Sequence, residues 1–165
     1  MEKVNDSTFQ GYRYSKGWAK NQKEYFSMVI SKPAESFFIV DEGKKFHSNK
    51  RKGKGVIGFI NFSTNEKEKI YAKLGISAVS IKNAHENLLN EISDWNFKKI
   101  KNNAQNNWND ELSKIKIKTN DLTKKRIFYT ALYHFMITPN LYQDINGEYR
   151  GCLLYTSPSP RDGLL

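Results

Sequence analysis

Cysteine is almost absent from this chain, because Cys152 is the single thiol among 165 residues. One cysteine excludes an internal disulfide and any zinc site built from several thiolates. Its neighbours Gly151, Leu153 and Leu154 include no base that would activate the thiol as a nucleophile. The chemistry of this protein therefore rests on other side chains.

Long apolar runs are also lacking. No stretch approaches the about 20 apolar residues that a helix needs to span a bilayer, so we expect no membrane span. Residues 1–6 lack the apolar segment of a signal peptide, so nothing in them directs export. Hydrophobic residues nevertheless make up 38% of the chain and aromatic residues 13%, which favours a packed core over disorder.

Acidic residues are too few to balance the basic ones, with 17 Asp and Glu against 27 Lys and Arg and a net charge of +10. Six of the basic residues lie in segment 44–54, which contains no acid. Such a run occurs in nucleic-acid-binding proteins, but a lysine- and asparagine-rich composition is more typical of a solvated surface. We therefore expect no nucleic-acid partner, and we expect residues 44–54 to form a long hairpin loop.

The first half of the chain has the patterning of β-strands. Apolar and aromatic residues alternate or cluster in five short segments: 8–14, 24–31, 37–40, 55–62 and 69–76. The alternating apolar residues of the last segment should face a core: Ile70, Ala72, Leu74 and Ile76. Five short strands without intervening helices predict an antiparallel sheet, as part of a sandwich.

The second half has helical spacing. Ser80 is a candidate N-cap for a first helix, and Asp94 for a second. Steps of three and four residues predict their apolar faces: Ala84, Leu88 and Ile92 in the first, and Phe97, Ile100, Ala104, Trp108, Leu112 and Ile115 in the second. A third helix, 126–138, ends before Pro139 and is apolar on nearly every side, so we expect protein to surround it.

Strands followed by helices indicate an α+β chain in two parts, with the boundary near residues 77–80.

Residues that could carry out catalysis or bind a metal are few in both parts. His85 and Glu86 are adjacent and diverge on a helix, so they favour a polar face over a metal site. His134, in the third helix, is expected to be a core histidine with satisfied hydrogen bonds.

The polar segment after the third helix contains Asp144, Asn146 and Glu148, with a turn expected at Asn146-Gly147. Their alternation is similar to a calcium-binding loop, but Tyr155 stands where that loop requires an acid. A turn that presents carboxylates is the better interpretation. No pair of carboxylates in the sequence is recognisable as a catalytic acid and base.

Several blocks of sequence, taken in order, resemble one family. The first are Phe9-Gln-Gly-Tyr-Arg-Tyr-Ser-Lys-Gly-Trp18, Tyr25-Phe26, Gly75-Ile-Ser-Ala-Val-Ser80, Ala84-His-Glu-Asn-Leu88, Glu91 and Asp94-Trp-Asn-Phe97. The others are Trp108, Tyr129-Thr-Ala-Leu-Tyr-His134, Pro139 and Asp144-Ile-Asn-Gly-Glu-Tyr-Arg-Gly151. Together they are similar to glycoside hydrolase family 92, the calcium-dependent exo-acting α-mannosidases.

This resemblance implies the end of an N-terminal antiparallel β-sandwich over residues 1–77 and linker helices over 78–119. The start of an (α/α)6-barrel catalytic domain would follow over 120–151. The stretch 152–165 does not continue the family pattern and is expected to be an artefactual tail. The chain would then be an internal fragment of a longer enzyme.

The resemblance also implies a function for that parent. It would remove terminal α-linked mannose from a glycan with inversion, using a glutamate as acid and an aspartate as base, with calcium bound to the sugar hydroxyls. The catalytic residues and calcium ligands have no counterparts here, so we expect the fragment to be inactive. The parent would be periplasmic or extracellular.

Six residues are candidates for substrate binding: Tyr133, His134, Asp144, Tyr149, Arg150 and Trp18. Trp18 suits stacking on a sugar ring, although a buried tryptophan of a sandwich is also compatible with the sequence. Two other functions therefore stay open. One is a self-sufficient carbohydrate-binding sandwich that uses Trp18, and the other is a basic nucleic-acid-binding protein that uses residues 44–54.

Overall fold

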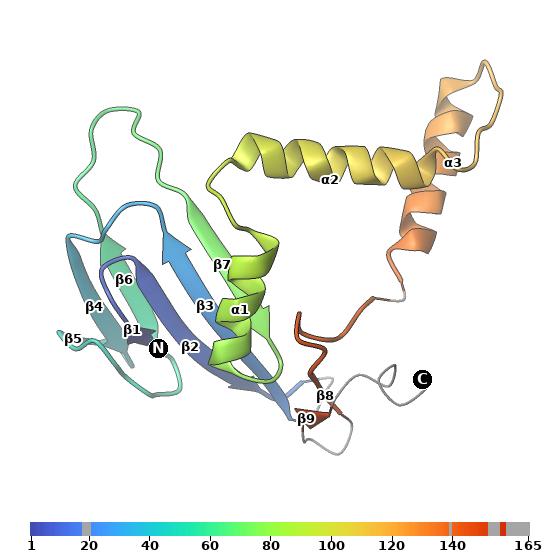
Figure 1. Cartoon of the computed structure of the whole chain (residues 1–165). Helices are drawn as coiled ribbons and strands as arrows, with labels where there is room; N and C mark the ends of the chain where they lie inside the picture. Colours follow the sequence, from blue (N-terminus) through green and yellow to red (C-terminus); the bar gives the residue numbers. More distant parts are fainter. Residues whose placement is uncertain (18–20, 139, 152–155, 158–165) are drawn as a thin grey trace. The chain divides into compact units, whose positions relative to one another are not determined.

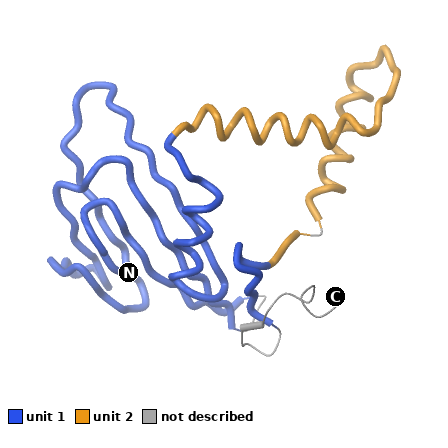
Figure 2. The backbone as a smooth tube through the Cα atoms, in the orientation of Figure 1, with its two compact units in different colours: residues 1–95, 143–165 blue, residues 96–142 orange. Residues whose placement is uncertain are grey.

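The computed structural model of the chain describes residues 1–17, 21–138, 140–151 and 156–157 (Figure 1). Trp18, Pro139 and Cys152 lie outside these residues. The backbone forms two compact units, shown in different colours in Figure 2. Unit 1 comprises Met1–Trp95 together with Gln143–Leu165, and unit 2 comprises Asn96–Tyr142.

Unit 1 is built from antiparallel sheets and one helix. Its elements are β1 (Glu2–Lys3), β2 (Thr8–Ser15), β3 (Gln22–Ile30), β4 (Ser36–Asp41), β5 (Lys44–Phe46), β6 (Ile57–Asn61), β7 (Ala72–Ser77), α1 (Ile81–Glu91), β8 (Tyr149–Arg150) and β9 (Thr156–Ser157). The strand orders are β1-β2-β3-β7, β5-β4-β6 and β8-β9. All five strands expected from the sequence are present, so the predicted antiparallel sandwich followed by helices is confirmed.

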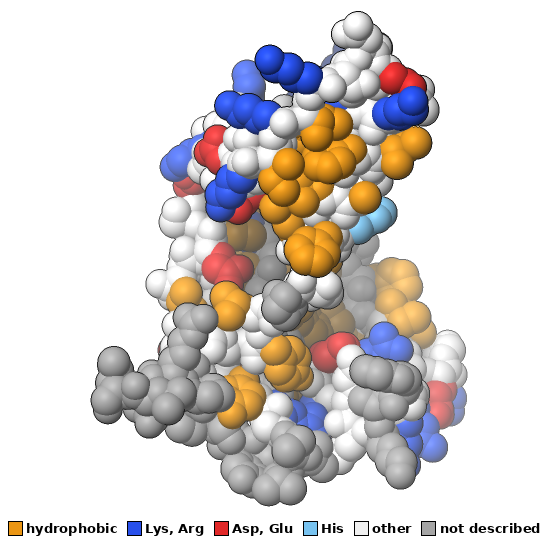
Figure 3. All heavy atoms as spheres, turned by 90° about the vertical axis from the view of Figure 1, so that its right-hand side faces the viewer, with side chains coloured by type: hydrophobic (Ala, Val, Ile, Leu, Met, Phe, Trp, Pro, Cys, Tyr) orange, Lys and Arg blue, Asp and Glu red, His pale blue; other side chains and the backbone are white. Residues whose placement is uncertain are grey.

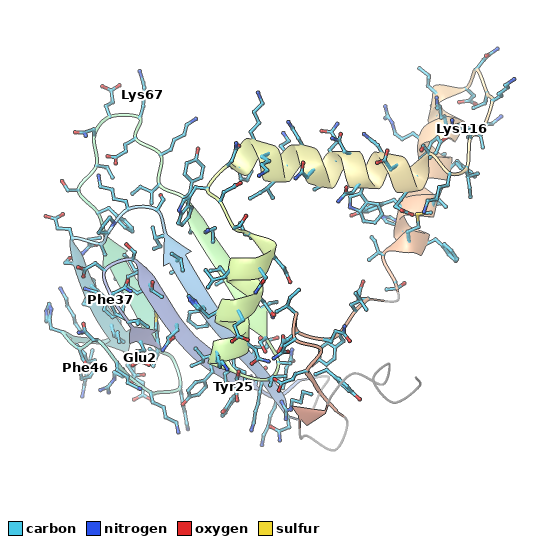
Figure 4. All side chains as sticks on the ribbon, viewed as in Figure 1. Glu2, Tyr25, Phe37, Phe46, Lys67 and Lys116 are labelled. Carbon is cyan, nitrogen blue, oxygen red and sulfur yellow. The ribbon has the colours of Figure 1, made fainter. Side chains whose placement is uncertain are left out.

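The core of unit 1 lies between the four-stranded and the three-stranded sheet. Phe9 of β2 is 0% exposed and packs with Ile30 and Ala34. Its ring lies 5.3 Å from that of Phe37, which comes from β4 in the other sheet (Figure 4). These contacts join the two sheets because aromatic side chains bury large apolar surfaces.

The predicted loop 44–54 is partly wrong, because its first residues form strand β5. Glu42 and Gly43 both have positive φ angles, 49° and 77°. That geometry fits a two-residue hairpin turn, which reverses the chain from β4 into β5 despite the lysines in the strand. Within the run, the Arg51 Nε donates to the buried carboxylate of Asp41 over 2.8 Å.

The prediction for β7 was wrong about which residues are buried. Leu74 and Ile76 are 56% and 67% exposed, whereas Gly75 and Ser77 are buried. The reason is that α1 packs on the Gly75 face. A Cβ added at Gly75 would lie 2.0 Å from the Ala84 carbonyl oxygen, so the helix comes closer than any larger residue allows.

Helix α1 begins and packs as the sequence predicts. The Ser80 hydroxyl accepts a hydrogen bond from the Asn83 amide over 3.0 Å, which confirms the N-cap. Ala84 and Leu88 are fully buried against the sheet. At the other end, the Lys73 ammonium donates to the Ile92 carbonyl over 3.0 Å. A cation at this position also suits the helix dipole.

Unit 2 contains two helices, α2 (Phe97–Leu112) and α3 (Leu122–Met136). Two expected details need correction. Asn96, not Asp94, is the N-cap of α2, and Ile115 lies beyond the end of that helix. Helix α3 begins four residues before the predicted start at residue 126, because the Asp121 side chain caps it.

The expectation that protein surrounds the third helix is not met within the described chain. Neither α2 nor α3 contains a buried residue. Phe135 is 78% exposed, and Figure 3 shows hydrophobic side chains gathered on the surface. Over the described residues, no helix is both long enough and apolar enough to cross a membrane.

Candidate functional site

The most elaborate polar structure in unit 1 surrounds the carboxylate of Asp144, a residue only 7% exposed. The Ser77 hydroxyl donates to its Oδ2 over 2.6 Å, and the Asn83 amide donates to the same oxygen over 2.8 Å. The Asn87 amide donates to Oδ1 over 2.8 Å. We call these four residues the Asp144 clamp.

Further hydrogen bonds connect the clamp to the backbone around it. The Asn87 amide also donates to the Ile76 carbonyl over 2.9 Å, and its Oδ1 accepts from the Ile145 amide over 2.9 Å. The Asn83 amide donates to Glu148 Oε2 over 2.7 Å. Strand β7, helix α1 and the segment from residue 144 are therefore held together by polar groups that satisfy one another.

Local structure explains why these donors converge. Asn83 and Asn87 are one turn apart, so they lie on the same face of α1. Ser77 is the last residue of β7, and its hydroxyl also accepts from the backbone amides of Val79 and Ser80. One hydroxyl thus shapes the connection between β7 and α1 while it donates to Asp144.

The segment after Asp144 forms a turn. The Gly147 amide donates to the Asp144 carbonyl over 2.9 Å, and the Asp144 amide donates to the Glu148 carbonyl over 2.8 Å. The turn is therefore centred on Ile145 and Asn146, one residue earlier than predicted. Gly147 follows it with φ of 82°, a conformation that glycine adopts without strain.

This turn does not form a calcium site. Both carboxylate oxygens of Asp144 already accept hydrogen bonds from neutral donors, and Glu148 accepts one from Asn83. The described residues contain no group of three or more His, Cys, Asp or Glu side chains that could hold a metal ion. Calcium prefers six to eight oxygen ligands, so the residues present do not fit the ion that the resemblance implies.

Next to the clamp, three tyrosines gather on the same face of the sheet as α1. Tyr12, Tyr25 and Ser77 are paired in register across β2, β3 and β7. The Tyr12 ring lies 4.8 Å from that of Tyr14 and 6.2 Å from that of Tyr25. We call Tyr12, Tyr14 and Tyr25 the tyrosine cluster, and Figure 4 shows Tyr25 near the end of the sheet.

The hydroxyl groups of this cluster interact. The Tyr14 and Tyr25 oxygens are 3.4 Å apart, within hydrogen-bonding distance. That hydrogen bond, followed by burial, raises the pKa of Tyr25 above its ordinary value. The contact with Tyr14 therefore favours the neutral, protonated form of the Tyr25 hydroxyl.

Arg150 brings a positive charge to this region. Its charge opposes the rise in the pKa of Tyr25, so the two groups interact electrostatically. Its Nη2 atom is buried and has no hydrogen-bond partner among the described residues. Tyr149 precedes it in β8, which pairs with β9. Arg150 therefore carries an unsatisfied donor close to the tyrosine cluster.

The structure separates the other predicted candidates from these. Tyr133 belongs to unit 2, where its ring packs 4.5 Å from Trp108. His134 is exposed, so the expectation of a core histidine was wrong. Its ring lies 5.8 Å from that of Tyr133. Trp18 is outside the described residues.

Sequence reasoning missed the three donors of the clamp. The available signal was the spacing of Asn83 and Asn87, four residues apart and adjacent to the apolar residues Ala84 and Leu88. Two asparagines beside an apolar stripe are positioned to donate hydrogen bonds to a polar group that packs on the helix. His85 also has a structural partner, because its Nδ1 lies 2.9 Å from the hydroxyl of buried Ser27.

The order of the elements defines the class of protein, a β-sandwich module that leads into a helical module. The model of the glycosyl hydrolase family 92 N-terminal domain matches residues 1–77, and that of the family 92 catalytic domain matches residues 83–158. The two matches together span nearly the whole sequence. The chain belongs to glycosyl hydrolase family 92.

Solved structures show the same fold. The chain is similar to a family GH92 alpha-mannosidase from Bacteroides thetaiotaomicron, with a TM-score of 0.86 and 29% identity over 96% of this chain and 22% of that one. A family GH92 inverting mannosidase from the same organism gives 0.80 and 22% identity over 88% of this chain and 21% of that one. This chain therefore spans about a fifth of the solved relatives' length.

A curated relative is also similar. An uncharacterised secreted glycosidase from Arthroderma benhamiae is 32% identical over 90 residues, which make up 52% of this chain and 11% of that protein.

Proposed function

We propose that this chain is part of a larger α-mannosidase-type glycosidase, at the point where the β-sandwich leads into the catalytic domain. The observation that carries this proposal is the 29% identity to an alpha-mannosidase over 96% of the chain, with a TM-score of 0.86. The same relative has been solved in complex with mannoimidazole. A mannose-containing glycan is therefore the proposed substrate.

The proposed reaction is hydrolysis of a terminal α-linked mannose with inversion. Inversion needs one carboxylic acid to protonate the leaving oxygen and one carboxylate to activate water on the opposite face of the sugar. Asp144 is unsuited to either role, because both of its oxygens accept internal hydrogen bonds. We assign it the structural task of holding the segment that leads to Tyr149 and Arg150.

A calcium requirement and export from the cytoplasm are further parts of the proposal. None of the roles that we assign to the described residues involves a calcium ion. The secreted relative from Arthroderma benhamiae supports a protein that works outside the cell. Tyr133 and His134 remain proposed substrate contacts of the catalytic domain.

The test compares this chain with a longer protein that contains residues 1–151. The chain alone should release no mannose from an α-mannobiose with calcium present. The longer protein should release mannose, first as the β-anomer, observed by proton NMR within the first minutes. Release of the α-anomer would contradict inversion, and turnover by the chain alone would show that it contains a catalytic site.

Calcium is tested on the same longer protein. Removal of divalent ions by a chelator should abolish mannose release, and added calcium should restore it. Full activity in the chelator would contradict the calcium requirement without affecting the assignment of the substrate.

A further inference from the structure

Strand β6 ends in a motif that the proposed enzyme function does not use. Asn61-Phe62-Ser63 has the Asn-X-Ser pattern of an acceptor for N-linked glycans in exported proteins. We infer that Asn61 is an N-glycosylation site and that the first sugar of its glycan packs on the Phe59 ring. This inference rests on the proposed function only in that the protein is exported.

The register of the three-stranded sheet places Asn61 beside a set of apolar side chains. Side chains two residues apart along a strand lie on the same face of a sheet. Phe37 points to the opposite side, where its ring packs against Phe9 in the core. We call the side away from the core the outer face, and strands β4 and β6 contribute six paired residues to it: Ser36, Phe38, Val40, Ile57, Phe59 and Asn61.

The aromatic part of the outer face has little protein cover. The Phe38 and Phe59 rings are stacked, with their centroids 4.8 Å apart and an angle of 4° between their planes. Phe59 is nevertheless 42% exposed, and Ile57 is 57% exposed. Strand β6 is also the last strand in the order β5-β4-β6. An apolar edge strand invites pairing with other chains, so a group that covers it is favourable.

A sugar attached to Asn61 would cover this surface. Residues two apart on a strand are roughly 7 Å apart, so a sugar ring joined to the Asn61 amide can reach the Phe59 ring. The C–H face of a pyranose is apolar and matches the face of an aromatic ring. The Lys45 ammonium already lies over the Phe38 ring, 4.0 Å from its centroid. Phe59 is therefore the ring on which the sugar packs.

The contacts of Asn61 are compatible with its modification. Asn61 is exposed, and its Nδ2 donates to the Ser36 hydroxyl over 2.8 Å. In the transfer, Nδ2 bonds to the anomeric carbon of an oligosaccharide carried by a lipid pyrophosphate. The bond from that carbon to the pyrophosphate oxygen breaks, the lipid pyrophosphate leaves, and the amide nitrogen loses one proton. The remaining N–H can still donate to Ser36.

A second Asn-X-Ser motif, Asn5-Asp6-Ser7, lacks such a surface. It lies between β1 and β2, and the Asn5 Oδ1 accepts a hydrogen bond from the Ser7 amide over 2.9 Å. The nearest aromatic residue in the sequence, Phe9, is fully buried. The sequence motif is therefore shared, but the aromatic surface is particular to Asn61.

The first test is site-resolved mass spectrometry of the full 165-residue chain, secreted behind a signal peptide from a eukaryotic cell line. Enzymatic removal of N-glycans in heavy-oxygen water should label Asn61. Ser63→Ala should abolish the label, whereas Thr64→Ala, which removes the next hydroxyl outside the motif, should leave it. An unlabelled Asn61, labelling at Asn5 alone, or labelling that survives Ser63→Ala would overturn the inference.

The second test measures Tm with and without the glycan. Glycan removal should lower Tm by about 2–4 °C, because a contact with an aromatic ring is lost. Removal should have no effect in Phe59→Ala or in the larger Phe59→Leu. Tyr71→Ala, which removes an exposed ring elsewhere in unit 1, should keep the full difference. Equal effects of removal in the wild type and in both Phe59 variants would overturn the packing.

Circular dichroism of each variant reports whether it is folded. Neither test reads mannose release, so an unmodified Asn61 would leave the proposed activity standing. Failure of the longer protein to release mannose would in turn leave the glycosylation of Asn61 standing.

Discussion

The two units of this chain use similar residues in different ways. Phe9 in unit 1 is fully buried between two sheets, whereas Phe135 in unit 2 is largely exposed on α3. Unit 1 also buries the Asp144 carboxylate, whose two oxygens accept hydrogen bonds from the other residues of the Asp144 clamp. The helices of unit 2 depend instead on capping residues and a few aromatic contacts. Stability should therefore be concentrated in unit 1.

The largest contrast should come from the same substitution in the two units. Phe9→Ala should lower the free energy of unfolding of unit 1 by about 3–5 kcal/mol, because it removes a buried ring and leaves a cavity. Phe135→Ala should change it by less than about 0.5 kcal/mol, because the ring is exposed. Urea unfolding followed by hydrogen exchange of the β2 and β3 amides measures both. Equal effects would mean that the units are not energetically distinct.

A smaller effect is expected from the clamp. Asp144→Ala should cost about 2–4 kcal/mol, since three buried donors lose a charged acceptor. Asp110→Ala, at an exposed position of α2, is the control and should leave the amides of β7 and α1 as protected as before. Loss of protection confined to residues 144–150 would show that the clamp orders this segment without stabilising the sheet.

The smallest effect concerns the tyrosine cluster. Tyr14→Phe should lower the pKa of Tyr25 toward its ordinary value, because the hydrogen bond that the neutral Tyr25 hydroxyl makes with the Tyr14 oxygen is the main cause of the rise. A raised folded pKa contributes stability below the ordinary value of about 10, and this is lost as pH rises through the folded value. Tyrosinate absorbance in a pH titration measures the shift. Tyr71→Phe, outside the cluster, should leave Tyr25 unchanged.

The same contrast shows what a sequence can predict. Strands β2, β3, β4, β6 and β7 and the cap at Ser80 follow from local residue patterns, and these were predicted correctly. Strand β5 was missed because its lysines suggested a loop, while the turn at Glu42-Gly43 determined the structure. The prediction placed the wrong face of β7 in the core. Alternation of apolar and polar residues defines the two faces of a strand, but it does not show which face α1 covers.

The clamp was beyond local reasoning for a different reason. Its contacts join residues 57, 61 and 67 positions apart in the chain, so no window of sequence contains both partners. Asp144 was identified as a candidate, but as a residue that presents a carboxylate to solvent or a ligand. The structure assigns the carboxylate to internal donors. Arg150 was named from the family resemblance, and only the structure shows its unsatisfied nitrogen.

The separation of the clamp's partners also sets an order of events during synthesis. Ser77, Asn83 and Asn87 leave the ribosome before the whole of unit 2, and Asp144 follows it. At about 5–20 residues per second, the donors wait roughly 3–13 s for their acceptor. During that interval water must satisfy these donors. The polar contacts of the Asp144 clamp can therefore form only after all of unit 2 has been synthesised.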